Sequence, residues 1–412
     1  MKDQQASYPQ LRFKGFTDPW EERKLGDLGS VAMNKRIFKE QTSDVGDIPF
    51  YKIGTFGGTP DAFISRDIFE EYKSKYQYPE VGDILISASG SIGRTVVYQG
   101  YDEYFQDSNI VWLKHDQQLD NSFLKQFYSI VKWQGLEGST IKRLYNKNIL
   151  ETKITLPSPE EQAQLGSFFK QLDDTIALHQ RKLAKLKELK QGYLQKMFPQ
   201  NASKFPQLRF AGFADAWEQR KFEYLLDEND GIRRGPFGSA LKKECFVSQS
   251  DYVVYEQQNA IYNKYETRYN ITKDKFEELK KFELKPEDFI MSGAGTIGRI
   301  SRVPHGIDKG VFNQALIRFR IDNRITDSEY FLQFIRADFM QKKLTSTNPG
   351  SAITNLVPMS EVKKWGILVP QINEQSKIGI FFKQLDKTIT LHQRKLEKLQ
   401  ELKKGYLQKM FC

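Results

Sequence analysis

Two segments in the second half of the chain repeat segments of the first half nearly residue for residue. The sequence PQLRFKGFTDPWEERK at residues 9–24 returns as PQLRFAGFADAWEQRK at residues 206–221. Residues 168–198 return as residues 381–411, with 26 of 31 positions identical. The chain therefore consists of two units of about 200 residues, each a globular part followed by a helix, and this period is too long for a solenoid. We interpret the chain as a duplicated module.

The two copies differ most in their globular parts. Residues 30–58 share little with residues 227–255, although the terminal helices are nearly the same. Different globular faces on a shared frame are expected of a protein that holds two different targets. An enzyme with two equal active sites would show the opposite pattern. We therefore expect two binding parts with different specificities.

A glycine pattern, SGAGTIGR at residues 292–299, has the G-x-G-x-x-G spacing of dinucleotide-binding loops. That spacing indicates a nucleotide site only between a strand and a helix. The second copy, SASGSIGR at residues 87–94, replaces the first glycine with Ala88, and β-branched residues follow both copies. The strand-like segments GDILIS and EDFIMS precede them. The pattern therefore predicts a strand–glycine turn–strand hairpin in each unit and not a Rossmann loop.

The segments that end each unit have the apolar spacing of long coiled-coil helices. Residues spaced alternately by four and three form one seam in each helix: Leu172, Ile176, His179, Leu183, Leu186, Lys190, Tyr193 and Met197, and Leu385, Ile389, His392, Leu396, Leu399, Lys403, Tyr406 and Met410. Neither helix can bury its seam alone, so we expect the two helices to pair. Six leucines lie off the seam and offer a second apolar face to another protein: Leu178, Leu189, Leu194, Leu391, Leu402 and Leu407.

The bulk composition narrows the class of protein. The chain carries a formal net charge of +10 with a pI near 9.2, which favours a nucleic-acid partner. It has no run of about 18 apolar residues, so we expect neither a signal peptide nor a membrane span. Its two cysteines, Cys245 and Cys412, cannot build a disulfide framework, which fits a reducing cytoplasm.

A search for catalytic and metal-ligating patterns finds no enzyme site. His179 and His392 lie in the helix seams, and His115 and His305 have no cysteine or carboxylate at ligand spacing. A PD…ExK nuclease pattern fits residues 60–73, but its Pro-Asp pair becomes Thr-Arg in the second unit. There is no G-x-x-x-x-G-K-[ST] loop and no methyl-donor glycine loop, so we expect no cofactor and no catalysis.

Basic and amide side chains in glycine-rich loops are the better functional signal. Residues 138–149 and 232–243 place cations beside glycines that let the backbone approach a phosphate. Arginine and lysine favour guanine edges, and asparagine and glutamine favour adenine. The candidate DNA-binding residues are Gln106, Asn109, Ser139, Lys142, Arg143, Tyr145, Asn146 and Lys147 in the first unit, and Arg233, Arg234, Gly238, Ser239, Lys242, Asn313, Gln314, Ser351, Thr354 and Asn355 in the second.

In this order and twice over, the motifs resemble the specificity (S) subunits of type I restriction–modification enzymes. The resemblance covers essentially the whole chain. It rests on the LRF.GF…W entry, the GSIGR and GTIGR hairpins, the GPFGSAL loop at residues 235–241, and the helices that begin near Glu161 and Glu374. It implies an α+β fold class: two tandem α/β target-recognition domains related by pseudo-twofold symmetry and separated by two long antiparallel coiled-coil helices. The first unit lacks a GPFGS loop, so we carry no DNA contact onto its residues 30–45.

The resemblance also implies domain boundaries and partners. Residues 1–159 and 207–372 are expected to form target-recognition domains 1 and 2, residues 160–198 and 373–412 the two long helices, and residues 199–206 a linker. Each domain would read one half of a split sequence in double-stranded DNA, and the helices would dock two methyltransferase (modification) subunits. Those partners methylate adenine, while restriction subunits supply ATP-driven translocation and cleavage. The S subunit itself would be non-catalytic.

Two other classes of protein stay open at this point. A stand-alone DNA-binding regulator or scaffold would also carry tandem basic domains, although the apolar stripe at Leu178 and Leu189 argues for obligate partners. A self-sufficient DNA methyltransferase is disfavoured by the missing methyl-donor and catalytic motifs.

Overall fold

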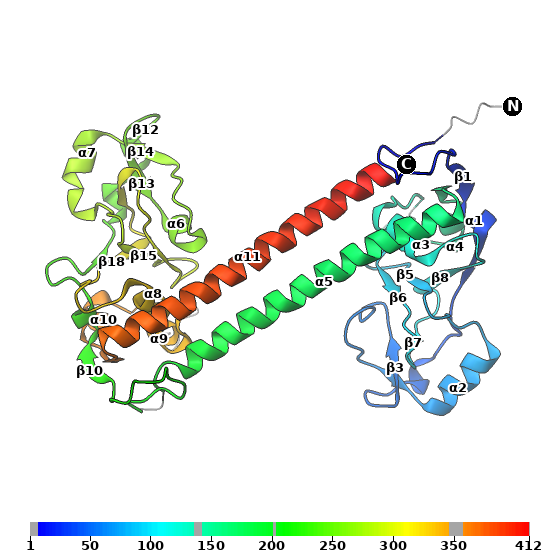
Figure 1. Ribbon diagram of the computed structural model, residues 1–412, viewed down its shortest axis with the longest axis horizontal. Helices are drawn as coiled ribbons and strands as arrows, with labels where there is room; N and C mark the ends of the chain where they lie inside the picture. The colour runs from blue at the N-terminus through cyan, green and yellow to red at the C-terminus, as the bar shows by residue number, and fades with distance from the viewer. Residues whose placement is uncertain (1–6, 136–141, 201–202, 346–356, 412) are drawn as a thin grey trace. The chain divides into compact units, whose positions relative to one another are not determined.

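The chain folds into two compact units that share its two long helices (Figure 1). The structure, a computed structural model, describes residues 7–135, 142–200, 203–345 and 357–411. Unit 1 comprises residues 1–180 and 394–412, and unit 2 comprises residues 181–393. Each unit therefore contains one globular part, the beginning of one long helix and the end of the other.

Unit 1 is built from small sheets of four, three and two strands in its described residues. In chain order its elements are β1 (Glu21–Lys24), α1 (Leu25–Leu28), β2 (Gly29–Ala32), η1 (Lys39–Gln41), β3 (Ile48–Tyr51), β4 (Phe63–Ile64), α2 (Arg66–Lys75), β5 (Ile84–Ser87), β6 (Thr95–Val97), β7 (Tyr104–Phe105), β8 (Ile110–His115), α3 (Asn121–Ile130), α4 (Asn146–Leu150), β9 (Lys153–Leu156) and the first part of α5 (Pro159–Lys196). The largest sheet is antiparallel, in the order β2-β8-β5-β6. The next, β4-β3-β7, has one antiparallel and one parallel pair, and β1 pairs with β9.

Unit 2 repeats this topology with one strand added. After the end of α5 come β10 (Glu218–Lys221), η2 (Phe222–Leu225), β11 (Ile232–Arg234), η3 (Gly238–Ala240), η4 (Lys243–Cys245), β12 (Phe246–Val247), β13 (Tyr252–Tyr255), α6 (Gln257–Tyr262), β14 (Tyr269–Ile271), α7 (Lys273–Glu278), η5 (Lys280–Phe282), β15 (Phe289–Ser292), β16 (Ile300–Arg302), β17 (Lys309–Phe312), β18 (Leu316–Phe319), α8 (Ser328–Arg336), α9 (Asp338–Leu344), α10 (Met359–Lys364), β19 (Gly366–Val369) and α11 (Ile372–Met410). The sheets β11-β18-β15-β16, β12-β14-β13-β17 and β10-β19 correspond to those of unit 1. The duplication read from the sequence is thus a duplication of the fold.

The predicted glycine hairpins are confirmed. β5 pairs antiparallel with β6 across residues 87–94, and β15 pairs with β16 across residues 292–299. The last two glycines of each turn adopt positive φ, between 61° and 81°, which suits residues without a Cβ. The hydroxyl of Ser87 accepts the N–H of Arg94 at 2.9 Å, and that of Ser292 accepts the N–H of Arg299 at 3.0 Å. Each serine therefore closes its turn.

In each unit, the repeated entry motif binds to the motif at the start of the long helix. Arg12 donates two hydrogen bonds to the buried carboxylate of Glu161, at 2.8 and 2.7 Å. Arg209 repeats this contact with Glu374, at 2.7 and 2.8 Å. The glutamine after each glutamate accepts one backbone N–H and donates to two carbonyls. The motifs therefore fix the entry segment to the start of the long helix in both units.

The long helices α5 and α11 pair antiparallel, as predicted. In unit 1, Asp173 near the start of α5 contacts Lys403 near the end of α11, at 2.6 Å. In unit 2, Asp386 near the start of α11 contacts Lys190 near the end of α5, also at 2.6 Å. Each helix ends in the core of the unit that it reaches: α11 and the next residue supply Met410 and Phe411 to unit 1, and residues 197–198 after α5 enter the core of unit 2.

Candidate nucleic-acid interface

In unit 1 the glycine turn, the loop between β7 and β8, and the segment before α4 converge. The hydroxyl of Ser89 in the turn donates to Oδ1 of Asn109 at 2.8 Å. Ser89 and Arg143 form an antiparallel β-bridge, and Arg143 donates to the carbonyl of Ser108 at 2.8 Å. Segments 20 to 54 residues apart in the sequence thus present amide, hydroxyl and guanidinium groups together.

The predicted residues of unit 1 have different surroundings. Asn109 and Arg143 meet at this convergence, and the ring of Tyr145 lies 5.7 Å from the Arg143 guanidinium. Gln106 lies on the same loop, but its side-chain oxygen accepts the N–H of Ile53 at 2.9 Å. The others are not tied to the turn by a hydrogen bond: Lys142, Asn146 and Lys147 are exposed. Ser139 lies outside the described residues.

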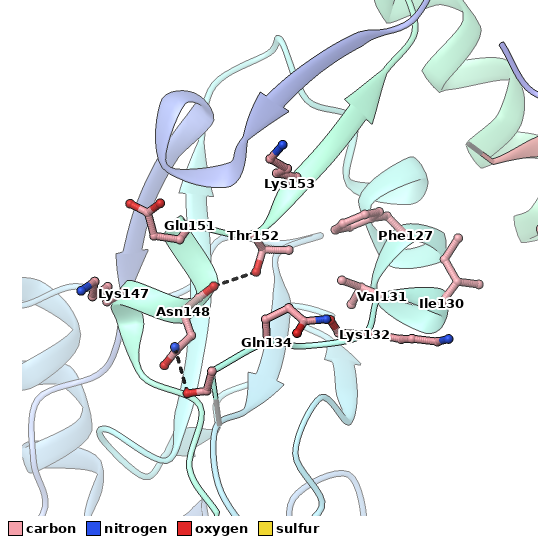
Figure 2. A pocket seen from close by; sticks show the side chains of 11 residues that line it. Phe127, Ile130, Val131, Lys132, Gln134, Lys147, Asn148, Glu151, Thr152 and Lys153 are labelled. Atoms are coloured by element: carbon pink, nitrogen blue, oxygen red, sulfur yellow. Dashed lines mark hydrogen bonds between the residues drawn. The ribbon is translucent and has the colours of Figure 1, made fainter. Parts of the chain in front are cut away.

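A cavity of about 640 Å³ in unit 1 involves only one predicted residue, Lys147 (Figure 2). α3 supplies an apolar wall with Phe127 and Ile130, while residues 147–153 supply the polar wall. The described lining contains no histidine or cysteine, and its one carboxylate, Glu151, pairs with Lys24 at 2.5 Å. The described part of the chain also has no group of three or more histidine, cysteine, aspartate or glutamate residues placed to hold a metal ion.

In unit 2 the GPFG loop at residues 235–238 packs onto the loop between β17 and β18. The N–H of Gly235 donates to the carbonyl of Leu316 at 3.0 Å. A Cβ on Gly235 would collide with the Asn313 carbonyl oxygen, so only glycine permits this approach. The amide of Gln314 lies 3.4 Å from the place of a Cβ on Gly238. Gly238, Asn313 and Gln314, predicted separately, are therefore neighbours.

The basic residues of this loop have different surroundings. Arg234 and Lys242 are exposed, and their side chains have no hydrogen-bond or ion-pair partner among the described residues. Arg233 instead donates to Asp230 at 3.0 and 2.7 Å. Burial raises the pKa of Asp230, but hydrogen bonds from Arg318 and Arg233 outweigh it and hold that pKa below the ordinary value. Ser239 is exposed, and Ser351, Thr354 and Asn355 lie outside the described residues.

The six predicted docking leucines are not equivalent. Leu178, Leu189, Leu391 and Leu402 are between 42% and 65% exposed. Leu407, at 8% exposure, belongs to the core of unit 1, and Leu194 packs against the core of unit 2. The face that is open to a partner is therefore smaller than the sequence indicated. None of the helices in the described ranges combines the length and apolarity needed to cross a bilayer.

Sequence reasoning missed two residues of these surfaces. Ser89 lies in a turn that was interpreted chiefly through its glycines, and Phe237 is an exposed aromatic side chain in the GPFG loop. An apolar residue flanked by glycine and cations, away from any apolar periodicity, was the available signal for Phe237.

Comparison with known proteins identifies the family. The model of the Type I restriction modification DNA specificity domain matches residues 17–188 and 237–401. The chain belongs to this specificity family. A putative type I restriction enzyme specificity subunit of Haemophilus influenzae is 59% identical over 145 residues, which span 35% of this chain and only 38% of that relative. A putative MjaX specificity subunit of Methanocaldococcus jannaschii is 22% identical over 94% of this chain and 91% of its own.

Solved members of the specificity family share the fold. The crystal structure of a type I restriction–modification S subunit from M. genitalium superposes with a TM-score of 0.61 at 14% identity, covering 98% of this chain and 99% of that one. At this identity the likeness supports the fold alone, which consists of α/β domains and long helices.

Proposed function

We propose that this chain selects the DNA target of a type I restriction–modification complex, with each unit reading one half of a split duplex sequence. The observation that carries the proposal is that the loop between β7 and β8 in unit 1 and the equivalent loop between β17 and β18 in unit 2 each meet a second polar loop, which is the glycine turn in unit 1 and the GPFG loop in unit 2. Unit 1 presents Ser89, Asn109 and Arg143, and unit 2 presents Arg234 and Gln314. Two units with the same topology but different side chains in their polar loops suit two different half-sites.

The two kinds of side chain suit two kinds of DNA contact. Exposed cations such as Arg234 and Lys242 suit phosphates, which set affinity and its salt dependence. Amides such as Asn109 and Gln314 suit base edges, where asparagine and glutamine pair with adenine in the major groove. The chain would therefore both position the complex on the DNA and read the DNA sequence.

The exposed leucines support docking of two modification subunits. Unit 1 contains Leu178 of α5 and Leu402 of α11, and unit 2 contains the equivalent pair, Leu391 and Leu189. Two equivalent apolar pairs suit two copies of one partner, which favours a complex over a stand-alone regulator or scaffold. Adenine methylation, ATP-driven translocation and cleavage would reside in the modification and restriction subunits, acting on DNA in the cytoplasm.

DNA binding is tested with the chain assembled with its modification subunits. Arg234→Ala and Lys242→Ala should each weaken binding and reduce the slope of log K against log salt by about 0.9, the loss of one phosphate contact. Arg324→Ala is the matched control, because Arg324 is an exposed arginine of unit 2 that pairs with Asp322. Unchanged slopes in both test variants would contradict the phosphate assignment.

Docking is tested by gel filtration of the full chain with modification subunits. Leu178→Glu with Leu402→Glu should leave a complex with one partner, and the same change at all four exposed leucines should leave none. Gln180→Glu, at an exposed position of α5, is the control. Retention of two partners by the fourfold variant would exclude this surface as the docking site.

A further inference from the structure

Phe237 is the most exposed large hydrophobic residue among those described, at 89%. A single exposed apolar side chain is ordinary on a protein surface. Phe237 is unusual in its position, because it lies in the GPFG loop of unit 2, where the next residue, Gly238, approaches Gln314, and it is within five residues of the exposed cations Arg234 and Lys242.

The backbone that carries Phe237 is held at both ends. Gly235 donates to the carbonyl of Leu316 at 3.0 Å, and the next residue, Pro236, is buried. Beyond the loop, Leu241 is buried in the core of unit 2. The ring is therefore presented to solvent by an anchored loop, and little ordering would be required when it meets a ligand.

The charge of the segment that carries the ring favours nucleic acid. Residues 232–243 contain four cations and no acidic residue, and three of these cations remain after Arg233 pairs with Asp230. Arg234 and Lys242 are exposed, and Gln314 lies over Gly238. The cores of protein–protein interfaces are depleted of lysine, whereas DNA-kinking proteins combine cations with inserted apolar side chains.

We propose that Phe237 inserts against one base step of the half-site read by unit 2 and stacks partly on a base. The inference rests on the proposed function. Unit 1 has no GPFGS loop, so the wedge acts on one half-site only. Pyrimidine–purine steps unstack most easily, so Phe237 contributes to specificity by favouring such a step without a hydrogen bond to it.

The test uses the full chain with its modification subunits and duplexes that carry 2-aminopurine at successive positions of the half-site assigned to unit 2. The unmodified complex should raise the fluorescence at one step. Phe237→Ala should abolish that rise and weaken binding about 5- to 150-fold, the range for loss of one base–aromatic stack, with an unchanged salt slope. Phe237→Trp should restore both. Phe38→Ala, which removes a 57% exposed phenylalanine of unit 1, should leave this half-site unaffected.

Three results would overturn the proposal. The first is a Phe237→Ala complex with normal affinity and an intact fluorescence signal. The second is loss of assembly with modification subunits in the absence of DNA, which would make Phe237 a protein contact. Specific binding that responds to Arg234→Ala but shows no fluorescence rise would reject the wedge alone, whereas no specific DNA binding by the unmodified complex would reject the proposed function.

Discussion

Arg209 shows how much one residue of the repeated entry motif contributes. Its guanidinium forms two hydrogen bonds with Glu374, whose side chain is only 2% exposed. We predict that Arg209→Ala destabilises the chain by about 3–5 kcal/mol, because it leaves a buried charge without its partner. Urea unfolding, with hydrogen exchange to report on unit 2, measures the loss. Arg12→Ala should act similarly in unit 1, since Arg12 holds Glu161 in the same way.

The control for this residue-scale prediction is an exposed arginine. Arg324 pairs with Asp322 at the surface of unit 2, where ion pairs contribute little to stability. Arg324→Ala should therefore leave the unfolding midpoint nearly unchanged. A loss of stability from Arg209→Ala as small as that from Arg324→Ala would show that the buried pair does not stabilise the chain.

At the scale of elements, the pairing of α5 with α11 should depend on pH through Asp173. Burial raises the pKa of this carboxyl, but Lys403 and Lys125 outweigh burial and lower it below the ordinary value. A depressed folded-state pKa contributes stability above the unfolded value of about 3.9 and loses it as the pH falls through the folded value. The stability difference between the unmodified chain and Asp173→Asn should therefore be constant above about pH 5 and shrink below about pH 4.

Urea midpoints of both chains from about pH 3 to 7 check this window. Asp174→Asn is the control, since Asp174 is the exposed neighbour on the same helix. A difference that persists undiminished to the lowest pH would mean that the Asp173 charge does not stabilise the pairing.

At the scale of the whole molecule, the two globular parts should be separable readers. Met197, Phe198, Ile378 and Phe382 in the core of unit 2 come from the long-helix segments, outside residues 207–370. A related domain placed at residues 207–370 would thus pack against the same frame. We predict that this exchange changes one half of the methylated sequence and preserves the other, as measured by methylation sequencing.

The matched exchange is residues 9–157 of unit 1, whose core likewise receives Leu407, Met410 and Phe411 from the end of α11 and the residue after it. That exchange should change the opposite half. If either exchange altered both halves or neither, the units would not read DNA independently.

The sequence by itself determined the duplication, the glycine hairpins and the long helices. These features depend on identity between copies and on spacing within a short window, and both are visible without long-range contacts. The divergence of the binding faces followed from the same comparison, whereas the α+β class followed from the resemblance to the specificity subunits. Loop residues such as Gly238 and Gln314 could be proposed as binding residues, but their contact could not, because about 75 residues separate them.

Only the tertiary structure decided which side chains are free to act. Arg233 and Arg234 are adjacent in β11, where side chains point alternately to opposite faces, and only Arg233 meets Asp230. Leu402 and Leu407 lie on the same helix, yet only Leu407 is buried, because the core of unit 1 reaches the end of α11. The exposure of a side chain and its ion pairing depend on residues brought together from distant parts of the chain. A local sequence pattern can therefore identify candidate binding residues, but only the folded structure shows which of them are exposed and unpaired.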